Sequence, residues 1–112
     1  MREIWGIKNC QSVKKALLFL DEKGIAYNFV DYKKNPPSLA LLKKWVEQKG
    51  LEVVLNKKGT TYRALGLKEK NLSKEELLKV MSENPTLIKR PILISEGVLE
   101  FGFSKEVYET LC

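Results

Sequence analysis

The sequence predicts an α/β protein in which two sheet-forming segments flank a helical middle section. Three observations support this prediction. Residues 1–32 alternate strand, helix and strand patterns, the section from about 38 to 84 carries helical patterns, and the last third returns to two strands and a helix. The 112 residues suffice for one buried core. We therefore expect a single domain over residues 1–112 with a helical insertion at about 38–84.

The N-terminal segment is typical of a strand–helix–strand unit. Residues 2–7 predict a short strand, about 11–23 a helix, and 25–32 a second strand that is rich in aromatic and β-branched residues. Gly24 can end the helix because glycine readily adopts the left-handed conformation. A helical crossover joins strands that run in parallel, so we expect a parallel pair. The apolar face of this helix comprises Val13, Ala16, Leu17 and Leu20.

The middle section shows helical patterns separated by turn residues. After Asn35-Pro36-Pro37, Ser38 can cap a helix that runs to about Lys49. A short helical turn over 51–55, a polar loop over 56–61 and another turn over 62–65 are expected next. Ser73 and Glu76 form a capping box for a helix through about Ser82. The inward residues are expected to be Leu39, Leu42, Trp45 and Val46 in the first helix and Leu77, Val80 and Met81 in the last.

The C-terminal segment changes to the period of strands. Residues 91–95 and 98–101 are separated by Glu96-Gly97, and a two-residue link that ends in glycine favours a β-hairpin. Ser104 can then cap a helix that carries Val107 and Leu111. The expected order is therefore βαβ, a helical insertion, and ββα.

The composition excludes several kinds of chemistry. The chain has no histidine, so Ser-His-Asp catalysis, Cys-His catalysis and histidine metal sites are all excluded. It has two cysteines, too few for a four-thiolate zinc site in one chain, and we expect no metal. Charged residues interrupt every apolar run, and no signal-peptide pattern follows the first residue, so we expect a cytoplasmic protein that does not contact membranes.

The net charge of +6 does not by itself indicate nucleic-acid binding. The cations are mostly lysines that alternate with glutamates, a pattern typical of solvated helix faces. Base-reading proteins depend on arginine, and no aromatic–basic RNA-binding motif is present, so a nucleic-acid partner is not expected. Residues 1–50 carry ten cations and five anions. Such local clusters of cations favour the binding of a small anionic substrate over the binding of a nucleic acid.

Cys10 is the candidate nucleophile. It lies between the first predicted strand and the first turn of the following helix, where unpaired amide groups and the helix dipole stabilise a thiolate. Lys8, Lys14 and Lys15 add positive charge nearby. The alternative is that Cys10 is merely a small buried hydrophobic residue. A thiolate formed in this way needs no histidine.

The second cysteine of a C-x-x-C pair would fall at position 13, which is Val13. Cys10 would therefore act as a single thiol, forming a mixed disulfide that an external thiol such as glutathione resolves. Cys112, the last residue, is either an incidental thiol or a resolving cysteine on a mobile tail.

Two further segments carry candidate anion-binding residues. Arg90 precedes Pro91 at the start of the hairpin and is either a surface residue or a donor to an oxyanion or carboxylate held near Cys10. Residues 56–63 hold Lys57, Lys58 and Arg63 without an acidic residue. This segment is either a polar loop or one wall of an anion site.

Together these features resemble the arsenate reductase/Spx (ArsC/Spx) family of thioredoxin-fold proteins, and within it the YffB-like branch. The segments that carry the resemblance are Ile4–Cys10, Val13–Ala16, Val30–Tyr32, Leu55–Arg63, Ile88–Pro91 and Gly102–Ser104. The resemblance covers nearly the whole chain. It implies a thioredoxin-like sheet with a helical insertion, a redox-active Cys10, and a cis-proline at Pro91 that packs against this cysteine.

The resemblance also implies alternatives for the activity. Arsenate reductases of this family surround the cysteine with three arginines, of which only Arg90 is present here, since Asn56 and Phe103 stand at or near the other two positions. Spx regulators bind RNA polymerase and typically carry C-x-x-C. The best expectation is thus an oxidoreductase, a YffB-like thiol reductase that uses glutathione as co-substrate without a bound cofactor; arsenate reduction and polymerase binding remain alternatives. The residues expected to bind glutathione or substrate are Lys8, Asn9, Lys14, Lys57, Arg63, Arg90 and Pro91.

Overall fold

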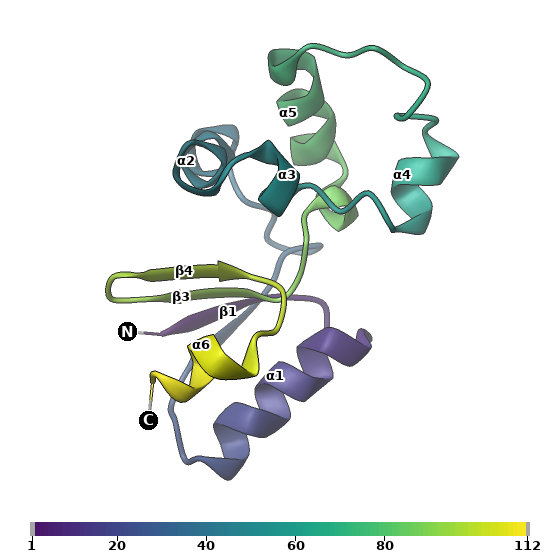
Figure 1. Cartoon of the computed structure of the whole chain (residues 1–112). Helices are drawn as coiled ribbons and strands as arrows, with labels where there is room; N and C mark the ends of the chain where they lie inside the picture. The colour runs from purple at the N-terminus through teal and green to yellow at the C-terminus, as the bar shows by residue number, and fades with distance from the viewer. Residues whose placement is uncertain (1, 112) are drawn as a thin grey trace. The chain divides into compact units, whose positions relative to one another are not determined.

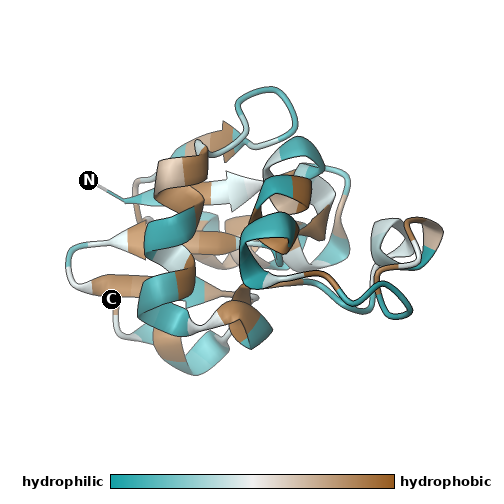
Figure 2. Cartoon of the chain, turned by 90° about the horizontal axis from the view of Figure 1, so that it is seen from above, coloured by the Kyte–Doolittle hydropathy of each residue, from teal (hydrophilic) through white to brown (hydrophobic). Residues whose placement is uncertain are grey.

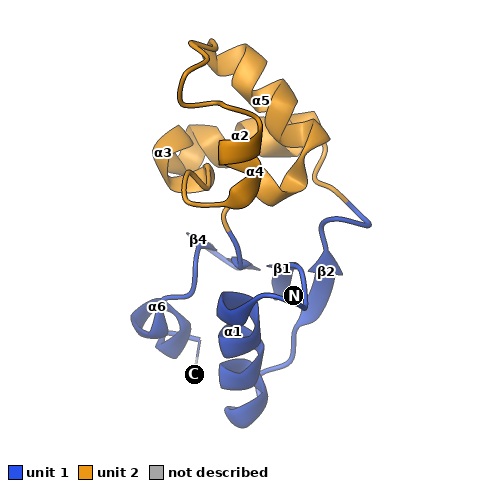
Figure 3. Cartoon of the chain, turned by 90° about the vertical axis from the view of Figure 1, so that its right-hand side faces the viewer, with its two compact units in different colours: residues 1–35, 90–112 blue, residues 36–89 orange. Residues whose placement is uncertain are grey.

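The computed structural model of the chain describes residues 2–111. Two compact units are present, one formed by residues 1–35 and 90–112 and the other by residues 36–89 (Figure 3). Cys112 lies outside the described residues. No helix in the described part of the chain is long and apolar enough to cross a membrane.

The first unit contains a four-stranded sheet formed by β1 (Glu3–Gly6), β2 (Asn28–Asp31), β3 (Ile92–Ser95) and β4 (Val98–Phe101), in the order β2-β1-β3-β4 (Figure 1). β1 and β2 pair in parallel, as the helical crossover predicted. β3 pairs antiparallel with both β1 and β4. The α/β fold class and the predicted hairpin are therefore confirmed.

Two helices of the first unit, α1 (Gln11–Glu22) and α6 (Lys105–Glu109), cover one face of this sheet (Figure 1). Both helices contribute to a core in which strand residues of β1 and β3 lie opposite each other. This core comprises Ile4, Ala16, Leu20, Leu93 and Tyr108, which are all fully buried. Burying these apolar side chains holds the sheet and α1 in a fixed relation.

The end of α1 explains why β2 is shorter than predicted. Gly24 has a φ of 68°, as the glycine signal indicated. The N–H of Ile25 donates to the carbonyl of Leu20 and that of Gly24 to Asp21, which together form a Schellman cap. The backbone after Gly24 therefore closes the helix first. The sheet begins only at Asn28, so the predicted start at residue 25 was wrong.

The second unit is helical, with α2 (Leu39–Lys49), α3 (Leu51–Val54), α4 (Thr60–Ala64), α5 (Lys74–Glu83) and the 3₁₀ turn η1 (Pro85–Leu87). Along the helices of both units apolar and polar residues alternate, as expected of amphipathic helices (Figure 2). The buried hydrophobic residues of the second unit are Leu42, Trp45, Val46, Val54, Leu55, Leu67, Leu78, Met81, Leu87 and Ile88, and Pro37 is also buried.

Both predicted helix caps of the second unit are confirmed. Ser38 accepts a hydrogen bond from the Leu41 N–H. Ser73 and Glu76 form both hydrogen bonds of the capping box. These caps satisfy amide groups that a helix N-terminus otherwise leaves without partners.

The predicted inner faces of α2 and α5 need correction. Leu39, the first residue of α2, is 40% exposed. In α5 the buried leucine is Leu78, while Leu77 and Val80 are only half-buried. The apolar residues of α5 form two adjacent pairs, Leu77-Leu78 and Val80-Met81, which fit more than one helical face, and packing within the unit selects among them. The polar loop is also shorter than predicted because α4 begins at Thr60.

Candidate active site

Cys10 is the N-cap residue of α1, in the short connection that follows β1. Its backbone is extended, and its carbonyl accepts the N–H of Lys14 at 2.9 Å, the first hydrogen bond of the helix. The side chain is a half-buried free thiol. The sulfur thus lies beside amide groups that have no partner within the helix.

The surroundings of Cys10 favour its thiolate. Burial raises the pKa of the thiol, but the N–H groups of Val13 and Ser12 and the guanidinium of Arg90 outweigh burial and hold the pKa below its ordinary value. Arg90 acts both through a hydrogen bond and through its charge. Hydrogen bonds and a positive charge directed at the sulfur favour the thiolate over the neutral thiol. A nucleophilic thiolate is therefore available without a general base.

Arg90 reaches Cys10 from the segment that leads into β3. Its Nη1 donates to the hydroxyl of Tyr32 at 3.2 Å, although the two residues are 58 positions apart in the sequence. Tyr32 is fully buried and follows directly after β2. The ends of β1 and β2 and the start of β3 thus meet at one edge of the sheet, where ligands commonly bind to α/β folds.

Pro91 is buried beside Arg90, and the Arg90–Pro91 peptide bond is cis, as the family resemblance implied. The Pro91 carbonyl accepts the N–H of Gly102 at 2.8 Å.

Gly6 allows the first turn of α1 to approach the end of β1. A Cβ at this position would come 2.8 Å from Cγ2 of the fully buried Val13 and 3.8 Å from the Cβ of Arg90. The first distance is shorter than a van der Waals contact allows, and a buried valine has little freedom to move. The absence of a side chain at Gly6 thus permits the close packing that places Cys10.

We expect Gly6→Ala to destabilise the protein by about 1–3 kcal/mol through overpacking. Urea unfolding monitored by circular dichroism measures this change. The cost of Gly6→Ala should be smaller in a Val13→Ala background, where the clashing methyl groups are removed. An equal cost in both backgrounds would contradict the packing explanation.

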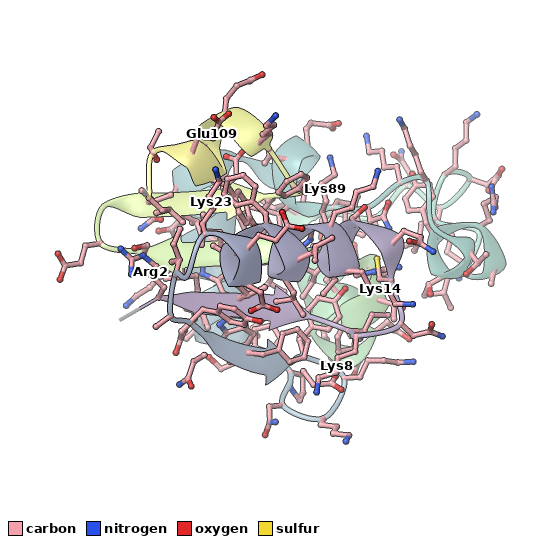
Figure 4. All side chains as sticks on the ribbon, turned by 90° about the horizontal axis from the view of Figure 1, so that it is seen from below. Arg2, Lys8, Lys14, Lys23, Lys89 and Glu109 are labelled. Atoms are coloured by element: carbon pink, nitrogen blue, oxygen red, sulfur yellow. The ribbon has the colours of Figure 1, made fainter. Side chains whose placement is uncertain are left out.

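The predicted lysine neighbours of Cys10 are solvent-exposed. Figure 4 shows Lys8 and Lys14 at the same end of α1. The Lys8 ammonium lies 5.6 Å from the ring centroid of Phe29, within cation–π distance, and Asn9 is also exposed. The cation that lowers the pKa of Cys10 is Arg90. The roles of Lys8, Asn9 and Lys14 in binding substrate stay predictions.

Two further candidates, Lys57 and Arg63, belong to the second unit. The Lys57 ammonium contacts both carboxylate oxygens of Glu52, at 2.8 and 3.0 Å. Arg63 is exposed on α4. An anion would have to compete with Glu52 for Lys57. The expected role of Lys57 and Arg63 in binding glutathione stays a prediction.

Sequence analysis did not select Tyr32 as a site residue. One signal was available: Tyr32 ends the second predicted strand, and parallel pairing brings the ends of the first two strands to the same edge of the sheet. The contact of its hydroxyl with Arg90 could not be predicted in this way, because it depends on the antiparallel pairing of β3 with β1, which brings the segment before β3 to the same edge.

Known proteins resemble the chain over almost its whole length. The ArsC family pattern matches residues 5–111. An uncharacterized protein of Haemophilus influenzae is 42% identical, with 97% of this chain and 96% of that protein covered. A protein of Neisseria meningitidis serogroup A named arsenate reductase is 33% identical, with 91% and 90% covered. The solved structure of the YFFB (PA3664) protein superimposes with a TM-score of 0.90 at 35% identity, with 99% and 98% covered.

A more distant relative carries a different name. The global transcriptional regulator Spx 2 of Lactococcus lactis is 27% identical, with 95% of this chain and 82% of the regulator covered.

Proposed function

The chain belongs to the ArsC family, and from this premise we propose that it is a glutathione-dependent thiol–disulfide reductase with a single nucleophilic cysteine. The observation that carries the proposal is the Cys10 thiol at the N-terminus of α1, with its pKa lowered by amide groups and Arg90 although burial opposes them. Val13 stands where the second cysteine of a C-x-x-C pair would be, so we propose that an external thiol completes the cycle.

The proposed reaction has two disulfide exchanges. The Cys10 thiolate attacks the glutathione sulfur of a mixed disulfide, forms a Cys10–glutathione disulfide and releases the substrate thiolate, which takes a proton from water. A glutathione thiolate then attacks the glutathione sulfur on Cys10, giving glutathione disulfide and restoring the Cys10 thiolate. Overall, the substrate mixed disulfide and one glutathione thiolate give the substrate thiolate and glutathione disulfide, and Cys10 is unchanged.

The chain's own groups stabilise the Cys10 thiolate in both exchanges. The Val13 and Ser12 amides and Arg90 favour the thiolate as attacking group and again as leaving group. When Cys10 is in the mixed disulfide, the Arg90 guanidinium is available to a glutathione carboxylate. We propose separately that Lys57 and Arg63 of the second unit contribute to glutathione binding. The reaction needs reduced glutathione, so we propose a cytoplasmic setting.

Two alternatives rest on the names of relatives. Arsenate reduction is favoured by the Neisseria protein, and Arg90 suits an oxyanion. Binding to RNA polymerase is suggested by the 27% identical regulator. The thiol reductase is preferred because a single low-pKa thiol supports disulfide exchange, while Asn56 and Phe103 stand at or near the positions of two arginines found in arsenate reductases of the family.

A direct test supplies a glutathionylated peptide and glutathione, and couples formation of glutathione disulfide to glutathione reductase and NADPH. The expected result is turnover, together with a glutathione adduct at Cys10 in intact-mass and peptide analysis after acid quenching. A parallel reaction contains arsenate in place of the peptide. Turnover with arsenate but not with the peptide would replace the proposal by arsenate reduction. If neither the peptide nor arsenate supported turnover, the thiol reductase and the arsenate reductase proposals would both be overturned.

A further inference from the structure

We propose that Tyr32 is a positioning residue for Cys10, since its buried hydroxyl holds the Arg90 guanidinium in place beside the sulfur. The proposal deepens the proposed function and rests on it in taking Cys10 as the reacting group. Tyr32 itself is not required to touch substrate, and it acts through Arg90.

The backbone and burial of Tyr32 make it a rigid support. Its side chain is fully buried, and its N–H donates to the Gly6 carbonyl at 3.1 Å. Gly6 is the last residue of β1 and pairs in register with Asp31 at the end of β2. The phenol is therefore anchored to the strand that leads directly to Cys10.

Arg90 needs such a support because its side chain is long and has many rotamers. Its Cβ lies over Gly6, 3.8 Å from the place of a Cβ on that glycine. From there Nη1 donates to the Tyr32 hydroxyl at 3.2 Å, and the guanidinium also lies within hydrogen-bonding reach of the Cys10 sulfur. A second fixed contact reduces the conformational freedom that Arg90 would otherwise lose on binding the thiolate.

A neutral support suits this task better than a carboxylate. Burial raises the pKa of the Tyr32 phenol, and the opposing effect of Arg90 is smaller, so the phenol stays protonated at neutral pH. An aspartate or glutamate in its place would pair with Arg90 and cancel the charge that Cys10 requires. The hydroxyl instead orients the guanidinium and leaves its positive charge available to the thiolate.

The test is the alkylation rate of Cys10 with iodoacetamide as a function of pH, which requires no disulfide substrate; all proteins carry Cys112→Ser so that one thiol reacts. We expect Tyr32→Phe to react about 3- to 10-fold more slowly at pH values below the wild-type pKa, the effect of one lost hydrogen bond. The rates should converge at alkaline pH, where both thiols are ionised. In an Arg90→Met background, Tyr32→Phe should cause no further change.

Tyr108→Phe is the matched control. Tyr108 is also fully buried in the first unit, but its hydroxyl has no hydrogen-bond partner among the described residues. Its replacement should leave the pH profile unchanged. An unshifted profile for Tyr32→Phe, an equal loss at every pH, or a persistent loss in the Arg90→Met background would overturn the proposal. If Tyr32→Phe shifted the alkylation profile but the wild-type protein showed no reductase activity, the proposed function would be overturned and the positioning role of Tyr32 would still be supported.

Discussion

Replacement of Cys10 by serine is expected to lower glutathione-dependent reduction of a glutathionylated peptide by at least about 10³-fold. Serine keeps the size of the side chain, but its hydroxyl is not ionised at neutral pH and cannot form a disulfide. Val13 occupies the only position from which a C-x-x-C partner could substitute for Cys10. The measurement is glutathione disulfide formation at equal concentrations of folded protein, verified by circular dichroism.

The matched control for this prediction is Cys112→Ser, which leaves one cysteine at position 10. We expect it to retain wild-type turnover and the Cys10–glutathione adduct. If Cys10→Ser kept most of the activity, the single-thiol mechanism would be wrong. If both variants lost activity, Cys112 would be a resolving cysteine, and the proposed release by a second glutathione would have to be replaced by an intramolecular disulfide.

Replacement of Arg90 by methionine is expected to slow Cys10 alkylation and peptide reduction by about 10- to 100-fold at neutral pH, the range for a lost hydrogen bond to a charged group. Methionine keeps an unbranched stem but removes the guanidinium. The N–H groups of Val13 and Ser12 still favour the thiolate, while the opposing effect of burial remains. The pKa of Cys10 should therefore rise, and less thiolate should be present at neutral pH.

The pH dependence gives the sign of this effect. In the wild type, Arg90 lowers the pKa of Cys10, so the thiolate persists to a lower pH than in an ordinary cysteine. The rise in reactivity with pH should move to higher pH in Arg90→Met. Well above both pKa values the variant should react at least as fast, since a less acidic thiol gives a more nucleophilic thiolate.

The same pH titration of Arg90→Lys separates charge from geometry. Lysine keeps the charge but lacks the planar fork that can contact Tyr32 and Cys10 together. We expect an intermediate shift. A profile that is identical in wild type, Arg90→Met and Arg90→Lys would show that the helix N-terminus alone determines the pKa of Cys10.

Local features of the fold were predictable to the extent that neighbouring residues produce them. The Gly24 cap, the Ser73/Glu76 capping box and the Glu96-Gly97 hairpin each depend on a few consecutive residues, and each is confirmed. The inner face of α5 was predicted incorrectly because Leu77 and Leu78 are equally apolar. Their burial differs only through the packing of the second unit.

The candidate site divides in the same way. The sequence alone was sufficient to place Cys10 at a helix N-terminus, and it showed that no histidine and no second cysteine at position 13 can assist it, because these features depend on residue identity and short-range geometry. The contact between Arg90 and Tyr32 was decided by the tertiary structure alone. These residues are 58 positions apart, and a hydrogen bond between them forms only when β1, β2 and β3 come together at one sheet edge. Local geometry was therefore enough to predict a Cys10 thiol of low pKa, whereas the assembly of the sheet was needed to orient the Arg90 guanidinium beside it.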